Sequence, residues 1–170
     1  MLSESARAAS AAEARYRIDA PNSKARAVKV IALDASSEDV VKRLSQSSWN
    51  NASFFTASAF AAATRQGERF SMQGWLSDLA GRTKDLVDEI DSADLVVMVA
   101  SAGADASAAS LIGEACSAKR VTTTVLVLGV AEISDAALAR SLAQLRPWAL
   151  MLVIASAEEY IADMLAALRA

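Results

Sequence analysis

From residue 27 onward, short apolar runs alternate with stretches in which apolar residues recur at helical spacing. The runs are six to eight residues long, rich in β-branched, leucine or aromatic residues, and bounded by polar residues or glycine. Runs that are apolar on both faces are typical of strands in a parallel sheet covered by helices on both sides. Five strands are therefore predicted, at residues 28–33, 52–57, 95–100, 121–128 and 148–155.

Amphipathic helices are predicted between these strands. Leu138, Leu142 and Leu145 recur at i, i+4 and i+7, which places them on one face of a helix that Pro147 ends. Similar spacing predicts helices after the first and third strands, helical stretches around Gly81, and a closing helix. The residues that mark these helices are Val40, Val41, Leu44, Leu76, Leu79, Leu86, Val87, Ile90, Ala108, Leu111, Ile112, Ala115, Ile161, Met164, Leu165 and Leu168.

Strands that alternate with helices define an α/β fold class. Because crossovers between parallel strands are right-handed, the expected architecture is a three-layer αβα, doubly wound (Rossmann-like), mainly parallel sheet of about five strands. Residues 27–170 are expected to form this single αβα domain, since the length leaves little room for a second one. Residues 1–26 are rich in alanine and serine and are predicted to be an N-terminal arm, partly disordered or helical.

The composition excludes several kinds of chemistry. The chain has no histidine, which removes Ser-His-Asp and Cys-His catalysis and histidine metal sites. Cys116 is the single cysteine, so it can form neither an internal disulfide nor a multi-cysteine zinc site. The 17 basic and 20 acidic residues give a net charge of −3, whereas a general nucleic-acid binder needs a basic excess. We expect no nucleic-acid partner, no metal and no cofactor.

The sequence contains no candidate membrane segment. No apolar run reaches the roughly 20 residues that span a bilayer. The first residues also lack the basic leader and apolar block of a secretory signal. No membrane partner is expected, and a cytoplasmic location is the default expectation.

Candidate ligand-binding residues lie where the strands are predicted to end, because ligands of open α/β sheets bind beyond the carboxyl ends of the strands. Three segments fall there, namely residues 34–37, residues 101–107, and Gly129 with its loop. The first two lack the glycines that let a backbone approach phosphate. No catalytic residue is assigned. The candidate ligand-binding residues are Asp34, Ser36, Ser37, Ser101, Gly103, Asp105 and Ser107.

Several of these residues have a structural alternative. Asp34 can cap the helix that follows it, together with its neighbouring serines, and Asp105 or Ser107 can cap the helix after the third strand. Both interpretations stay open. Cys116 is predicted to be a buried small hydrophobe, because no partner that would activate a thiol is visible in the sequence.

Two neighbouring segments carry a family resemblance. Residues 93–103, Ala-Asp-Leu-Val-Val-Met-Val-Ala-Ser-Ala-Gly, and residues 108–115, Ala-Ala-Ser-Leu-Ile-Gly-Glu-Ala, resemble the strand, phosphate loop and helix of the tubulin/FtsZ GTPase family. The resemblance covers about residues 27–156 and implies a nucleotide-binding domain. The phosphate loops are degenerate, with residues 34–38 and 104–107 in place of glycine-rich runs, and 170 residues leave no room for the family's second domain. The resemblance therefore implies the family's scaffold without its GTPase loops.

Aromatic residues cluster in one irregular segment. Six of the nine fall within residues 49–75. The rings either fill the core of an alanine-rich chain or form an exposed patch for a partner. An irregular connection of this length is unusual unless it covers or binds something. We therefore predict a homodimer, the commonest symmetric assembly, whose interface includes Trp49, Phe60, Phe70 and Trp75.

Three functions are compatible with these observations. The sequence favours a non-catalytic or regulatory binding module on a nucleotide-binding-type αβα scaffold, which acts through a small molecule or a protein partner. One alternative is a nucleotide- or metal-dependent enzyme with a variant site, in which Asp34 and Asp105 approach one ligand. A second alternative is a self-associating structural protein. Convergence of the two aspartates on one cavity would favour the enzyme.

Overall fold

The computed structural model describes residues 25–58, 75–79, 82–155 and 158–170, so residues 1–24 of the predicted arm lie outside it. None of the described helices is long and apolar enough to cross a bilayer. The elements are β1 (Val28–Ala32), α2 (Ala35–Leu44), β2 (Ala52–Thr56), β3 (Trp75–Asp78), β4 (Thr83–Asp85), α4 (Leu86–Asp91), β5 (Leu95–Ser101), α5 (Ala108–Lys119), β6 (Thr122–Leu128), η2 (Val130–Glu132), α6 (Asp135–Leu145), η3 (Arg146–Trp148), β7 (Met151–Ile154) and α7 (Glu158–Ala167).

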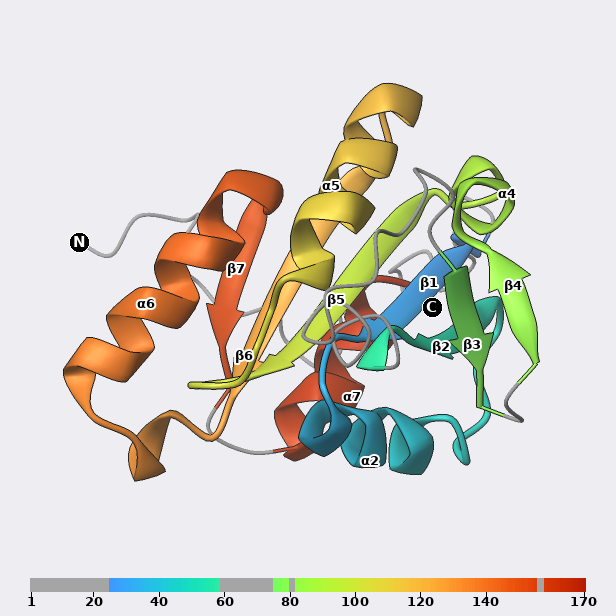
Figure 1. Cartoon of the computed structure of the whole chain (residues 1–170). Helices are drawn as coiled ribbons and strands as arrows, with labels where there is room; N and C mark the ends of the chain where they lie inside the picture. Colours follow the sequence, from blue (N-terminus) through green and yellow to red (C-terminus); the bar gives the residue numbers. More distant parts are fainter. Residues whose placement is uncertain (1–24, 59–74, 80–81, 156–157) are drawn as a thin grey trace, which may run out of the picture.

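One sheet runs through the centre of the molecule, in the strand order β4-β3-β2-β1-β5-β6-β7 (Figure 1). β2, β1, β5, β6 and β7 are parallel to their neighbours in this series, whereas β3 and β4 add an antiparallel hairpin beside β2. The predicted α/β class and the five-stranded parallel sheet are confirmed. Numbered along the chain, the five parallel strands are arranged 2-1-3-4-5, which is the flavodoxin-like order.

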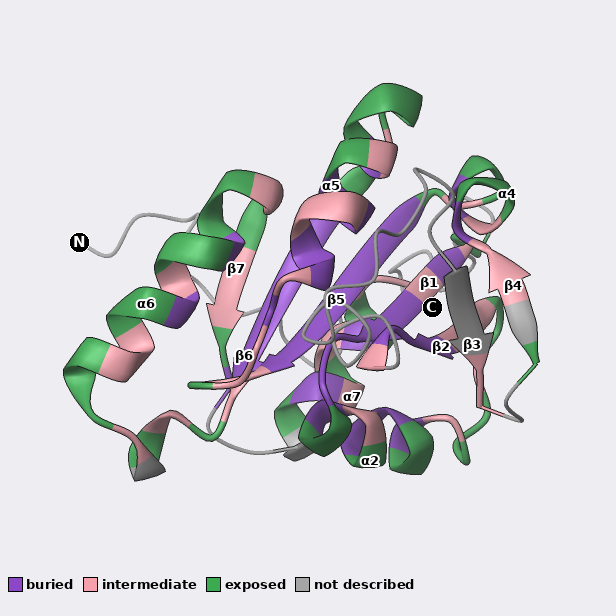
Figure 2. Ribbon diagram, in the orientation of Figure 1, coloured by how far each residue is buried: buried purple, intermediate pink, exposed green. Residues whose placement is uncertain are grey.

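Helices cover both faces of this sheet (Figure 2). α4, α5 and α6 lie on one face, where Ile112 and Leu145 pack with Met98 of β5. α2 and α7 lie on the other face, where Val41 and Leu165 belong to a second apolar cluster. The sheet therefore separates two hydrophobic cores, as the doubly wound architecture requires.

β5 is the central one of the five parallel strands and is buried along almost its whole length. Residues 95–100 are at most 3% exposed. Val96 and Met98 belong to one apolar cluster and Val97 and Val99 to the other, because successive side chains of a strand point to opposite faces. Both faces need apolar residues, so the continuous apolar run in the sequence is the correct signal for this strand.

The helical prediction around Gly81 is wrong for its first part. Leu76 belongs to β3, which pairs antiparallel with β2 and β4, and a helix begins only at Leu86. Asp78 closes the turn between β3 and β4: its carboxylate accepts from the backbone N–H of Arg82 at 2.8 Å and forms an ion pair with that side chain at 2.7 Å. Leu76 and Leu79 are three positions apart, a spacing that also occurs on one face of a helix. Pairing with β2 and β4 nevertheless makes this segment a strand.

The last strand begins later than the predicted residues 148–155. Arg146–Trp148 form the 3-10 turn η3, and β7 begins at Met151. Pro147 occupies the start of this turn, and the side chain of Trp148 packs directly over Gly113 of α5. The aromatic residue that suggested a strand is therefore used to join the turn to the neighbouring helix.

The contact between Gly113 and Trp148 yields a stability prediction. Alanine ordinarily favours a helix over glycine by about 1 kcal/mol. A Cβ on Gly113, however, would lie 2.7 Å from both Cβ and Cε3 of Trp148, and a Cβ cannot move without its backbone. We expect Gly113→Ala to lower the free energy of unfolding by about 1–2 kcal/mol in urea titrations. Glu114→Ala, at an exposed position of the same helix, is the control. A stabilised Gly113→Ala protein would contradict this packing.

Candidate functional site

The strand order reverses between β1 and β5, which lie side by side. The chain leaves β1 toward β2 on one side, and it leaves β5 toward β6 on the other. The crevice at such a switch point is the usual ligand site of this architecture. Asp34 follows β1, and Ser101 ends β5, so two of the predicted site residues meet here.

The carboxylate of Asp34 is occupied by hydrogen bonds within the protein. Its Oδ1 accepts from the N–H of Ser37 at 3.0 Å and from the hydroxyl of Ser101 at 2.8 Å. Its Oδ2 accepts from the N–H of Ser101 at 2.7 Å. In return, the backbone N–H of Asp34 donates to the hydroxyl of Ser37 at 3.1 Å, which completes a capping box at the start of α2. Only 9% of Asp34 is exposed. The helix-cap interpretation describes its role, with a tie to β5 in addition.

The remaining predicted site residues do not gather around one point. The backbone N–H of Gly103 donates to the buried hydroxyl of Ser141 on α6 at 2.8 Å, which turns this loop toward α6. The carboxylate of Asp105 accepts from the N–H of Ser107 at 3.0 Å, which forms an Asx turn directly before α5 and does not cap the helix. Ser107 makes no side-chain cap, and its hydroxyl is buried without a partner among the described residues. Neither Asp34 nor Asp105 is among the described residues that line the cavity at this end of the sheet.

A cavity of about 530 Å³ opens beside the switch point, at the carboxyl ends of β5 and β6. Of the predicted residues, Ser36 and Ser101 line it, and Gly129 belongs to its wall as expected from its place after β6. The lining combines hydroxyl groups, one carboxylate, one guanidinium and an apolar surface. The full lining is Ser36, Asp39, Val40, Arg43, Ser101, Ala102, Leu128, Gly129 and Ile133.

Sequence reasoning missed the contribution of α2 to this cavity. Asp39 and Arg43 are one helical turn apart, so they share a face of α2 and reach the cavity together. The sequence shows that Asp39 and Arg43 follow Asp34 within the same predicted helix. The helix face that turns toward β6 could not be identified without the sheet order.

A second polar cluster, also missed, lies between α2 and the end of β2. The carboxylate of Glu38 accepts from the hydroxyls of Thr56 at 2.9 Å and Ser58 at 2.6 Å, and it forms an ion pair with Lys42 at 2.7 Å. Burial opposes ionisation of Glu38, but the hydrogen bonds from Lys42, Ser58 and Thr56 outweigh it, and its pKa is lowered. The cluster joins helix to strand, and each of these groups is paired within it.

Cys116 and the acidic residues offer no metal or thiol site in the described part of the chain. Cys116 lies on the buried face of α5 and is fully buried in the core. Burial raises the pKa of its thiol to about 12. A thiol of this kind is unreactive, as the sequence predicted. The described residues contain no group of three potential metal ligands among histidine, cysteine, aspartate and glutamate.

The aromatic segment is described only in part. Phe60 and Phe70 lie outside the described residues, and of Trp75 only its place in β3 is described. Trp49 is half-buried: its indole N–H donates to the carbonyl of Leu44 at 2.8 Å, and its ring lies 6.1 Å from that of Phe54. Trp49 therefore contributes to packing at the end of α2. The homodimer interface through these aromatics stays a prediction.

No protein-family model matches the chain, and no curated protein matches it closely enough to count as a relative. No family match therefore confirms the resemblance to the tubulin/FtsZ family. The structure supports a parallel five-stranded α/β sheet of the kind that nucleotide-binding proteins use.

The three hydrogen bonds of Asp34 predict a large cost for its neutral replacement. In Asp34→Asn, one carboxylate oxygen becomes an amide nitrogen, which would face N–H or O–H donors, and the charge that strengthens the bonds is lost. We expect the free energy of unfolding to fall by about 2–4 kcal/mol. Asp39→Asn, at an exposed position of the same helix, should change it by less than about 0.5 kcal/mol. Equal stability of the two variants would contradict the bridging role.

The lowered pKa of Glu38 predicts an acid-dependent contribution to stability. Folding favours the ionised form, so the stabilisation is complete above the ordinary glutamate pKa of 4.5. It is lost as the pH falls through that value toward the lower folded pKa. The stability difference between the wild type and Glu38→Gln should therefore be largest at pH 7 and shrink below pH 4.5. Urea unfolding across pH 3–7 measures it, and a difference that stays constant over this range would contradict the prediction.

Proposed function

We propose that this protein is a non-catalytic binding module that takes a small polar ligand in the cavity at the carboxyl ends of β5 and β6. The observation that carries the proposal is the cavity itself, which stands where this fold class places ligands. Its volume of about 530 Å³ is that of a small-molecule pocket.

The charges of the lining favour a ligand without a phosphate chain. Asp39 and Arg43 together contribute no net charge, and the carboxylate of Asp34 lies directly behind Ser101. The loop after β5 has an alanine and an aspartate where a phosphate cradle needs glycines. Hydroxyls beside the apolar side chains suit a compact molecule with hydrogen-bonding groups at one end and an apolar part at the other.

The absence of an activated nucleophile favours binding over catalysis. Serine nucleophiles are activated by a base such as histidine, which this chain lacks. The hydroxyl of Ser101 donates to Asp34, but a carboxylate is a weak base for a serine hydroxyl. Ser36, on the opposite wall, is exposed in the first turn of α2. The lining is therefore suited to recognition, and the proposed role of a bound small molecule is regulatory.

A thermal-shift screen with a blocked cavity tests this function. Nucleotides, dinucleotides, amino acids, sugars and other small metabolites are tested with the wild type, with Ser36→Trp, which fills the cavity mouth, and with Ser48→Trp, an exposed serine after α2 that does not line the cavity. A true ligand at 100 times its Kd stabilises the fold by about 2.7 kcal/mol. We expect this in the wild type and Ser48→Trp and its loss in Ser36→Trp.

Two results would contradict the proposal. Tight, magnesium-dependent binding of GTP or ATP would show that a phosphate site survives. A ligand that stabilises Ser36→Trp as well as the wild type would lie elsewhere on the protein.

A further inference from the structure

The two edges of the sheet are protected differently. At one edge, β4 is three residues long and includes Lys84 and Asp85, the short and charged kind of edge that discourages pairing with another strand. At the other edge, β7 consists of Met, Leu, Val and Ile, without charge or proline. In the described part of the chain β7 pairs only with β6. Among the described residues, its outer edge is open to a further strand.

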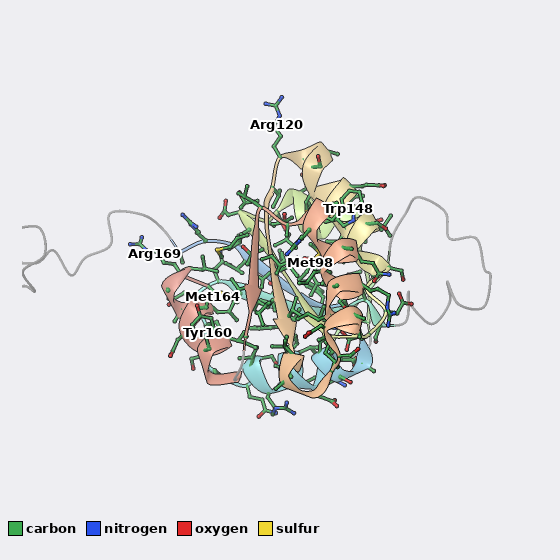
Figure 3. All side chains as sticks on the ribbon, turned by 90° about the vertical axis from the view of Figure 1, so that its left-hand side faces the viewer. Met98, Arg120, Trp148, Tyr160, Met164 and Arg169 are labelled. Atoms are coloured by element: carbon green, nitrogen blue, oxygen red, sulfur yellow. The ribbon has the colours of Figure 1, made fainter. Side chains whose placement is uncertain are left out.

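Exposed apolar side chains gather at the same edge. Five large hydrophobic residues are exposed in the described part of the chain, and four of them lie on β7, directly before it or on α7, which covers it. These four are Leu150, Met151, Ile154 and Tyr160, the last of which is labelled on α7 in Figure 3. Leu150 is 80% exposed. Exposed apolar residues that are grouped, rather than scattered, mark an interaction site.

A cavity of about 440 Å³ adjoins this edge at the amino end of β7. Trp148 and Leu150 contribute apolar walls, and Ser117 and Thr122 contribute hydroxyls. Arg120 is the only charged residue among the described residues that line it. The cavity is large enough for one apolar side chain, and its single charge is positive.

Arg120 occupies an unusual backbone position. It ends α5 with φ 56° and ψ 33°, a left-handed conformation that glycine usually takes at this place. Its N–H donates to the carbonyls of Cys116 and Ser117, which closes the helix. Its side chain projects beyond the end of α5, at the same end of the sheet as Trp148 (Figure 3). The cap therefore places Arg120 beside the cavity, with its charged side chain extended outward from the end of α5.

We propose that this surface binds an extended peptide segment of a partner protein, which lies along β7 as an additional strand. Strand addition to a free edge supplies main-chain hydrogen bonds, and pockets for side chains supply specificity. One apolar side chain of the segment enters the cavity beside Trp148, and a carboxylate of the segment pairs with Arg120.

Charge complementarity decides the direction of the segment. β6 and β7 are parallel, so Arg120, which precedes β6, lies at the amino end of both strands. A segment that runs antiparallel to β7 brings its carboxyl end to Arg120, whereas a parallel segment would bring its amino end there. The carboxylate is either the terminus of the partner or an acidic side chain near it.

This surface is independent of the cavity of the proposed function. The two lie at opposite ends of the parallel strands, so either can bind without the other. A peptide result therefore leaves the small-ligand proposal untouched, and the reverse also holds.

Peptide selection tests the proposal. A displayed library of random eight-residue peptides with free carboxyl termini is selected against the wild-type protein. Enriched peptides are synthesised with a fluorescent label in three forms: free carboxylate, terminal amide, and amide with an added aspartate. In fluorescence anisotropy we expect the free carboxylate or the aspartate form to bind about tenfold more tightly than the plain amide. Which of the two binds identifies the source of the carboxylate.

Two variants and two matched controls locate the site. Arg120→Gln should remove the preference for the carboxylate, and Leu150→Glu should weaken binding at least tenfold. Arg140→Gln, an exposed arginine on α6, and Val87→Glu, an exposed apolar residue on α4, should bind as the wild type does. All four substitutions are at exposed positions, and thermal melts check that each variant is folded.

Several results would overturn the proposal. These are a selection that enriches no peptide, equal binding of carboxylate and amide forms by the wild type, and unchanged binding by Leu150→Glu. Sedimentation that shows a dimer which Leu150→Glu dissociates would assign the edge to a second copy of the chain. Binding of phenylpropionate alone as tightly as the peptide would assign the cavity to a small carboxylate.

Discussion

The carboxylate of Asp34 is the interaction on which the functional end of the molecule depends. It joins the end of β1, the first turn of α2 and the end of β5 through three hydrogen bonds, two of them to Ser101. These elements meet where the strand order reverses, the place at which doubly wound sheets open a crevice. In this protein the buried carboxylate of Asp34 lies at that place and is bonded to Ser37 and to Ser101, which is 67 residues from Asp34 in sequence. An unpaired buried charge is costly. The carboxylate therefore needs the donors of Ser37 and Ser101, and these donors need the carboxylate as their acceptor.

The bridge also explains where ligands can and cannot approach. The carboxylate of Asp34 is bound within the protein, and the cavity lies toward the carboxyl end of β6, between α2 and the loop at Gly129. The polar groups there are hydroxyls and one charge of each sign, which suits recognition better than phosphate chemistry. At the far end of the same strands, a free edge and exposed apolar residues form a surface of different chemistry.

The sequence predicted the architecture well because buried parallel strands leave a strong signal. The apolar run of β5 and the three leucines of α6 each identified their element, and the cap at Asp34 was a stated alternative. Local pattern failed where distant contacts decide. Leu76 lies in a strand because β3 pairs with β2 and β4, and Trp148 lies in a turn, with its ring packed over Gly113. The partnership of Asp34 with Ser101, and the cavity face of α2, depend on the sheet order.

Native-state hydrogen exchange of the backbone amide of Ser101 tests whether the carboxylate of Asp34 is held inside the fold. If the carboxylate of Asp34 is a permanent part of the fold, this N–H is protected nearly as strongly as the amides of β5 that open only on global unfolding. The account also predicts that saturating magnesium and nucleotide leave that protection unchanged. Rapid exchange of the Ser101 amide in the free protein, or a change in its protection when magnesium is added, would show that Asp34 is available to a ligand and would contradict the account.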